Sequence, residues 1–258
     1  MKTFIAQRAV PALVFLALFA AWEIIVRINA IPPYVLPAPS LIGLTLIEDW
    51  ETLSLSLWVT LRITALALAL ATGIGVALAM MFAQWRWLER SFFPIAIILQ
   101  VTPIIAIAPL LLVYLDSSTA VLVCAFLVAF FPVLANTALG LASADTHLRD
   151  LFALYGATRW QEMLLLRAPS ALPYFLGGLR IAGGLALIGA IAAEIAAGAA
   201  GRGAGLAYRI VEAGYRLNIP RMFAALALIS VAGIAIYLLL DILSRLALRR
   251  WHNSSQKA

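Results

Sequence analysis

The feature that most constrains this chain is a series of apolar runs, each long enough to cross a lipid bilayer. A helix needs about 20 apolar residues to cross about 30 Å of hydrocarbon. The six runs that meet this requirement lie at about 9–28, 60–82, 92–115, 119–141, 174–198 and 223–246. They do not alternate between apolar and polar residues, which argues against the strands of a membrane β-barrel. The sequence therefore predicts an all-α polytopic membrane protein with six transmembrane helices.

Composition supports one membrane domain covering residues 1–258. The chain is 64% hydrophobic and 12% charged, whereas soluble domains are roughly 45–50% apolar and about 25% charged. Lys2 and Arg8 precede the first apolar run, as in a signal peptide, but the run is too long and lacks a clear cleavage site. We therefore expect an uncleaved anchor. The net charge of +6 follows mainly from the loops, so nucleic acid is not an expected partner.

Arginine and lysine indicate the orientation, because they accumulate in short cytoplasmic loops. The residues that carry this signal are Lys2, Arg8, Arg86, Arg90, Arg149, Arg159, Arg167, Arg245, Arg249, Arg250 and Lys257. Their distribution predicts that both termini and the loop at 143–172 are cytoplasmic, and that the loop at 199–221 lies on the outer face. This outer loop is an exception, since it holds Arg202, Arg209, Arg216 and Arg221. Attraction of an anion or acidic partner and simple solvation of the charge are equally good explanations.

The loop at 143–172 is the one elaborate polar segment between two spans. Helical periodicity from Leu148 to Tyr155 is followed by Gly156, which favours a bend, and by an amphipathic run from Thr158 to Arg167. We expect this second helix to end at Pro169. A helix, a bend and a second helix are typical of a docking element for another protein, and the alternative is an amphipathic helix lying at the lipid headgroups.

The sequence argues against catalysis by this chain alone. It has no phosphate-binding loop of the G-x-x-x-x-G-K-[ST] type, and its two histidines, His147 and His252, are far apart. The single Cys124 lies within the fourth run and offers neither a disulfide nor a cysteine metal site within the chain. We expect no cofactor and no metal, and a transport subunit rather than an enzyme.

The docking loop resembles the coupling motif of bacterial binding-protein-dependent ABC importer permeases. That motif reads Glu-Ala-Ala, three residues, Gly, nine residues, Ile, any residue, Leu-Pro. The matching positions here are Asp150, Leu151, Phe152, Gly156, Leu166, Ala168 and Pro169, with every spacing kept. Leu151, Phe152 and Ala168 depart from the pattern. The stretch Ala171–Gly184 and the pair Ala193–Glu194 resemble the branch that imports aliphatic sulfonates, taurine and nitrate, which also includes importers of pyrimidine-type and vitamin precursors.

The resemblance implies a type I importer permease in the bacterial inner membrane. Its expected partners are two copies of a cytoplasmic ABC ATPase, which bind the ATP, a periplasmic solute-binding protein, and a second permease copy, with a homodimer favoured. The residues expected to couple to the ATPase are Asp150, Leu151, Leu154, Tyr155, Gly156, Ala157, Arg159, Leu166 and Pro169. Glu162 is expected beside Arg159 at the rim of that contact. The sequence does not identify the solute, although a small organic anion is favoured.

Polar residues within the apolar runs are candidates for the translocation path, because they are costly in lipid. They are Gln100, Asn136 and Glu194. For Glu194 a role in the path is favoured, whereas the two amides more often tie helices together. Arg62 and Asp241 are expected to reach the membrane interface, and Arg180 is expected to form a structural pair.

Glycine and alanine are concentrated in the fifth run, which predicts close packing of that helix against its neighbours. Four prolines predict kinks in the third and fourth runs, namely Pro94, Pro103, Pro109 and Pro132. Two other functions compete with the importer hypothesis. One is an ion-coupled secondary carrier in which Glu194 titrates, and the other is a membrane scaffold that recruits a soluble partner. Dependence of transport on ATP distinguishes all three.

Overall fold

The computed structural model describes residues 2–198 and 203–249, without the side chains of residues 2–9, 11 and 12. Every regular element in this part of the chain is a helix. The elements are α1 (Lys2–Ile28), α2 (Pro39–Glu48), α3 (Trp50–Gln84), α4 (Arg86–Val101), α5 (Ile104–Tyr114), α6 (Ser117–Ala142), α7 (Thr146–Leu154), α8 (Arg159–Glu162), the π-helix η1 (Met163–Arg167), α9 (Ala168–Ala197), α10 (Leu206–Tyr215) and α11 (Ile219–Leu248). The all-α prediction is confirmed.

Four helical segments in the described residues are long and apolar enough to cross a membrane. They are α3, α6, the continuous run from Arg159 to Ala197, and α11, and the bent pair α4–α5 makes a fifth candidate if it counts as one span. The predicted runs at 60–82, 119–141, 174–198 and 223–246 lie within or largely within these helices. The run at 9–28 lies in α1, which is not among the counted spans and several of whose side chains are outside the described residues. The number six therefore stays a prediction.

The run at 92–115 is not the single helix that we expected. It divides into α4 and α5, which meet at an angle of 98°. Pro103 causes the break because it has no N–H to continue the helix and holds the preceding Thr102 in an extended conformation. Thr102 Oγ1 donates to Ile98 O at 2.7 Å, which satisfies one carbonyl near the break. The helices continue through Pro94, Pro109 and Pro132.

The core of the bundle is the contact between α6 and α9, and glycines make it possible. A Cβ added to Gly140 would lie 2.8 Å from Ala171 Cα, and one added to Gly189 would lie 2.9 Å from Ala125 Cα. Real Cβ atoms do not approach backbone so closely, so larger side chains at these glycines would push the helices apart. The predicted close packing of the fifth apolar run is confirmed.

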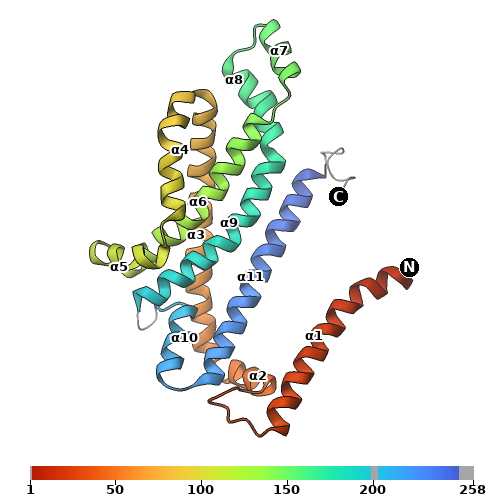
Figure 1. The fold of residues 1–258 in the computed structure, drawn as a ribbon, viewed down its shortest axis with the longest axis vertical. Coiled ribbons are helices and arrows are strands. Elements are labelled where there is room, and N and C mark those ends of the chain that lie inside the picture. The colour runs from red at the N-terminus through yellow and green to blue at the C-terminus, as the bar shows by residue number, and fades with distance from the viewer. Residues whose placement is uncertain (1, 199–202, 250–258) are drawn as a thin grey trace.

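The helices α3, α6, α9 and α11 lie side by side, and two groups of short helices mark opposite ends of the molecule, while α5 lies at the side of the bundle (Figure 1). The elements α7 and α8 form one end, which we call the docking end. At the other end, α2 and α10 lie beside the start of α11. The N-terminal part of helix α1 leans away from the bundle. Nearer its end, Trp22 makes a ring contact with Phe223, and the two ring centroids are 5.9 Å apart. Helix α11 finishes on the side of the docking end.

Candidate functional site

The docking end is built from local signals in the sequence. Helix α7 begins after Asp145, whose carboxylate accepts from His147 N at 2.7 Å. The chain then turns at Gly156, whose φ of +69° is a left-handed value that favours glycine. No atom lies within 4 Å of a Cβ added there, so glycine is needed for the backbone angle and not for space. Helix α8 begins with a capping box between Thr158 and Gln161. The predicted helix, bend and helix are confirmed.

The expectation that the second helix ends at Pro169 is wrong. The chain passes from α8 through η1 into α9 without a break, so the docking end is continuous with a membrane-length helix. A proline lacks the N–H that would bond to the carbonyl four residues earlier, and it collides with that carbonyl. The wider π-helical turn just before Pro169 lets the helix continue despite this conflict. Ser170 Oγ donates to Leu166 O at 2.8 Å in the same turn.

The predicted coupling residues divide into an exposed group and a group that faces the bundle. Leu154 and Tyr155 are 85% and 84% exposed, and Asp150, Leu151, Gly156 and Arg159 are also exposed. Ala157 is half-buried. A hollow of about 420 Å³ on this surface is lined by Leu151, Phe152, Tyr155, Gly156, Ala157, Gln161 and Leu165. Leu166 is buried and Pro169 half-buried, at the root of α9. Sequence reasoning missed Gln161 and Leu165, which amphipathic spacing alone does not distinguish.

We had expected Glu162 at the exposed rim of the contact with the ATPase, but its side chain turns inward. Its Oε1 accepts from Arg149 Nε at 2.9 Å and from Arg167 Nε at 2.8 Å. Arg167 also donates to Ala83 O at 3.3 Å, at the end of α3. These bonds tie α7 and η1 to the bundle. They are strong because hydrogen bonds between an arginine and a carboxylate are stronger than those between neutral groups. The five-residue separation of Glu162 and Arg167 is not the spacing that pairs side chains on an α-helix, and Arg149 is distant in sequence, so no local pattern indicated this arrangement.

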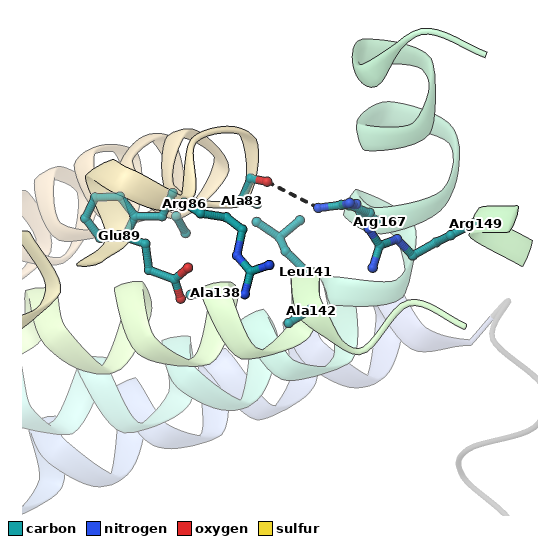
Figure 2. Close-up of a pocket in the computed structure, with 10 residues that line it drawn as sticks. Ala83, Arg86, Glu89, Ala138, Leu141, Ala142, Arg149 and Arg167 are labelled. Atoms are coloured by element: carbon teal, nitrogen blue, oxygen red, sulfur yellow. Dashed lines mark hydrogen bonds between the residues drawn. The ribbon is translucent and has the colours of Figure 1, made fainter. Parts of the chain in front are cut away.

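A cavity of about 370 Å³ lies next to this ion-pair cluster. Figure 2 shows Arg86 reaching it from α4 on the left, and Arg149 and Arg167 on the right. Its lining residues are Ala79, Phe82, Ala83, Arg86, Glu89, Ala138, Leu141, Ala142, Arg149 and Arg167. Sequence reasoning had used these arginines only as markers of orientation. The structure brings three of them from separate elements to one hollow.

Glu194 lies at the opposite end of the bundle, where its carboxylate accepts hydrogen bonds. It is only 4% exposed, and it accepts from Thr60 Oγ1 at 2.8 Å and from Ala207 N at 3.1 Å. Thr60 Oγ1 in turn accepts from Leu206 N at 3.0 Å. The carboxylate therefore binds the start of α10, where free backbone N–H groups favour a negative charge. A role in the path stays a prediction.

The other two candidates for the path lie on different helices. Asn136 Nδ2 donates to Pro132 O at 2.8 Å, within its own helix α6. Gln100 is exposed on α4, and its side chain has no hydrogen bond with any described residue. The structure joins none of the three candidates to another by a hydrogen bond, so their role in the path also stays a prediction.

We had expected the Asp241 side chain to extend to the membrane interface, but its carboxylate is buried and forms two ion pairs. Arg180 Nη2 lies 2.8 Å from Asp241 Oδ1, and Arg245 Nε lies 2.7 Å from Asp241 Oδ2. Asp241 as a whole is 9% exposed, and a buried charge requires such partners. The expected structural pair of Arg180 is confirmed. Arg62 is exposed, as expected for a side chain that extends to the interface.

The described arginines of the loop at 199–221 lie close to carboxylates. Arg209 and Arg216 approach the carboxylate of Glu212 at 2.8 Å and 2.9 Å, and Arg209 also donates to Ser56 Oγ at 2.9 Å. The hydrogen bond from Arg209 is the main reason that the pKa of Glu212 lies below its ordinary value. Arg221 lies 3.2 Å from Asp49. The side chains of Arg209 and Arg221 are largely buried in these contacts, whereas that of Arg216 is 68% exposed, and Arg202 lies outside the described residues.

Comparison with known proteins agrees with this geometry. The family of binding-protein-dependent transport system inner membrane components matches residues 69–253. In structure, the chain is similar to a protein whose crystal structure is titled as an amino acid ABC transporter with histidines, at a TM-score of 0.64 and 18% sequence identity. The match covers 78% of this chain and 97% of the other. At this identity the likeness concerns the fold.

Among curated proteins, the chain is 35% identical to the riboflavin transport system permease protein RibX of Chloroflexus aurantiacus, over 92% of this chain and 88% of that one. It is 34% identical to the formylaminopyrimidine transport permease protein ThiX of Halalkalibacterium halodurans, over 88% and 90%. A putative aliphatic sulfonates permease, SsuC of Bacillus subtilis, is 29% identical over 92% and 85%. The chain therefore belongs to the binding-protein-dependent transport system inner membrane components, and it is a multi-pass permease subunit of an ABC importer that works with an ATPase subunit and a solute-binding protein.

Proposed function

We propose that this chain is a six-span type I permease that forms the translocation path for a small solute, with both termini in the cytoplasm. The apolar sequence of α1 supports adding it to the helices that can span the membrane. Two observations support the orientation. The arginine-rich loop at 143–172 follows the rule for cytoplasmic loops, and α11 finishes on the same side as α7 and α8. The permease domain would comprise residues 1–258.

The exposure of Leu154 and Tyr155 is the observation that carries the coupling role. Both side chains lie at the last turn of α7, and each is more than four-fifths exposed. Large exposed apolar side chains beside a hollow are typical anchors for a partner protein. Asp150, Leu151, Gly156, Ala157 and Arg159 would complete the contact with the ATPase, with charges at the rim.

The continuous helix supplies a route from this contact to the membrane. Because α8, η1 and α9 form one run from Arg159 to Ala197, displacement of α8 by a closing ATPase dimer would move α9 directly. Leu166 and Pro169 lie at the junction and would transmit the movement rather than touch the ATPase. This division explains why the motif extends beyond the exposed surface.

The co-purification of the ATPase tests the docking surface. Tyr155→Ala removes an 84% exposed ring at the docking end, and Tyr215→Ala removes an 87% exposed ring at the opposite end, so the two variants match in chemistry and exposure. We expect Tyr155→Ala to reduce the ATPase retained on the tagged permease by about tenfold, the loss typical of an interface hot spot near 1.4 kcal/mol. Tyr215→Ala should retain the wild-type amount.

Equal retention by both variants would contradict the assignment, provided that both chains keep the wild-type thermal unfolding temperature. The permease family membership would survive that result. A second variant, Leu154→Asp, then decides whether any part of the exposed surface docks, because a buried unpaired carboxylate is strongly unfavourable in an interface.

For the solute, we favour a neutral nitrogen heterocycle over a small anion. The relatives named for riboflavin and formylaminopyrimidine transport share 35% and 34% identity across most of both chains. The sulfonate relative is at 29%, and the nitrate permease NrtB of Synechococcus elongatus matches only 43% of this chain. Among the described residues of α10, Arg209 and Arg216 both lie against Glu212, which lowers the positive charge that they offer to an anion.

Transport into proteoliposomes tests the solute and the competing carrier hypothesis together. With the partner ATPase and binding protein present, we expect ATP-dependent uptake of a pyrimidine or flavin, and none of taurine or nitrate. Uptake of taurine alone would restore the anionic solute. Uptake that follows an ion gradient without ATP, and that Glu194→Gln abolishes, would support a carrier instead.

We further propose that two copies of the chain surround the path as a homodimer. The large exposed apolar area of α1 and of the α4–α5 pair is compatible with lipid or with a second copy. Co-purification of two differently tagged copies from one membrane checks this, and recovery of only one tag would point to a related but different permease as the partner.

A further inference from the structure

The arginine cavity at the docking end is a candidate binding site that coupling to the ATPase does not use. It lies between the end of α3, the start of α4, the end of α6, α7 and η1. A second hollow of about 520 Å³ shares its wall and is lined by Ala83, Gln84, Trp85, Arg86, Trp87, Arg149, Arg159, Glu162 and Arg167. Three arginines line both spaces, namely Arg86, Arg149 and Arg167.

Positive charge is in excess over the two hollows together, because four arginines line them, the three named and Arg159, against only the carboxylates of Glu89 and Glu162. Glu162 bonds to the Nε atoms of two of them, which leaves other guanidinium donors for a ligand. The Arg86 side chain has no hydrogen bond or ion pair with any described residue, although it lines both hollows. Arginines brought together in this way favour an anion with several oxygens, because each planar fork can bind two of them.

The position of the cavity at the ends of two candidate spans favours a membrane lipid as the source of that anion. The spans α3 and α6 end beside it at Gln84 and Ala142. Trp85 and Trp87 line the second hollow and are 45% and 64% exposed. Tryptophan gathers at the level of the lipid headgroups, and basic pockets between transmembrane helices at that level suit anionic lipid headgroups. A phosphate group there would reach the arginines while its acyl chains stay in the bilayer.

We propose that this arginine cavity binds the phosphate group of an anionic phospholipid from the adjoining leaflet, with Arg86 on one side and Arg149 and Arg167 on the other. Glu162 holds the latter two arginines in place. The bound headgroup would supply the partner that Arg86 lacks in the chain and would join α4 to η1. The site depends on the membrane location of the chain and not on docking of the ATPase.

Native mass spectrometry of the full chain in detergent tests this site with phosphatidylglycerol as the probe and phosphatidylcholine as the neutral-headgroup comparison. Arg86→Gln removes a guanidinium that holds no other residue, so the fold should survive. We expect this variant to weaken phosphatidylglycerol binding about fivefold, the effect of one arginine near a lipid phosphate. Phosphatidylcholine binding should change less than twofold.

Two variants on the same helix provide the controls. Arg90→Gln makes the same charge change one turn further along α4, outside both hollows, and should leave phosphatidylglycerol binding within twofold of wild type. Glu89→Gln removes a carboxylate that lines the cavity, and it should strengthen phosphatidylglycerol binding a few-fold. Equal weakening by Arg86→Gln and Arg90→Gln would overturn the site in favour of general attraction to basic surface.

Inorganic phosphate distinguishes the two sources of the group. We expect millimolar phosphate to leave phosphatidylglycerol binding unchanged, because the free ion lacks the acyl chains that hold the lipid at the site. Full displacement of the lipid by phosphate would overturn the lipid assignment and identify a site for a soluble anion. Equal binding of the two lipids by wild type would overturn the proposal altogether.

Discussion

The two ends of the molecule use similar residues in opposite ways. At the α10 end, the carboxylate of Glu194 is buried, Leu206 is buried, and the arginines are largely paired with Glu212. At the docking end, large apolar side chains are exposed, and Arg86 has no partner among the described residues. Exposed apolar side chains also occur at the α10 end, among them Tyr215 and Leu217, so the difference between the two ends lies in their charged groups. A charged side chain without a partner in the described chain is thus the clearer guide to where another molecule binds.

The largest expected effect is at the closed α10 end. A Cβ at Gly205 would lie 2.1 Å from the Glu194 carboxylate, although the backbone angles there suit any residue. Gly205→Ala should displace the carboxylate from its bonds to Thr60 and Ala207. We expect a loss of about 3 kcal/mol in the free energy of unfolding, as hydrogen bonds to a buried charge are lost. Thermal unfolding in lipid nanodiscs measures it.

Gly203→Ala is the matched control, since no atom of the described residues lies within 4 Å of its added Cβ. It should shift stability by less than about 0.5 kcal/mol. Similar losses in the two variants would mean that loop flexibility, rather than the Glu194 contact, closes this end of the molecule.

The ion-pair cluster at the docking end should produce a smaller and local effect. Glu162→Gln removes the charge that holds Arg149 and Arg167, and we expect about 1–2 kcal/mol less protection of residues 145–167. Hydrogen exchange measures this protection. Glu51→Gln changes an exposed carboxylate without a side-chain hydrogen bond and should leave the segment unchanged. A uniform loss across all spans would show instead that Glu162 stabilises the whole bundle.

Substitutions of Gly156 test whether the docking end requires glycine for its backbone angle or for contact with the partner. Gly156→Ala should cost about 1 kcal/mol of local stability, because alanine disfavours the observed φ of +69°. Gly156→Asn should cost less, since asparagine tolerates that region and a Cβ there meets no atom of the described residues within 4 Å. ATPase activity stimulated by the loaded binding protein should follow the same order. A worse result for asparagine would indicate that the partner, not the backbone, requires glycine.

The smallest expected effect is the pH response of the α10 end. The hydrogen bond from Arg209 lowers the pKa of Glu212 below its ordinary value of 4.5. Its ion pairs therefore contribute fully above about pH 4.5, and the contribution is lost as the pH falls through the lower pKa of the folded state. The unfolding temperature should fall below pH 4.5 in wild type and fall less in Glu212→Gln. Parallel curves would assign the response to other carboxylates.

Apolar length and turn chemistry were readable from the sequence. The runs at 60–82, 119–141, 174–198 and 223–246 predicted long helices because burying that much apolar surface in lipid leaves few alternatives. Gly156 predicted the bend, since its requirement is local. The match of the Asp150–Pro169 spacing indicated the family, although Leu151, Phe152 and Ala168 depart from the motif. These inferences depend on neighbours along the chain.

The tertiary structure decided which side chains meet. Glu194 binds Thr60 and α10 rather than standing free, Asp241 is buried against Arg180, and Glu162 turns inward to Arg149. These partners lie on elements that sequence spacing does not relate, so long-range pairing had to be seen. The continuation of the helix through Pro169 depends on a π-turn, and the sequence predicted a kink at Pro103 but not the 98° angle between α4 and α5. Local propensity constrains the helices, but only the folded chain determines which charges are satisfied.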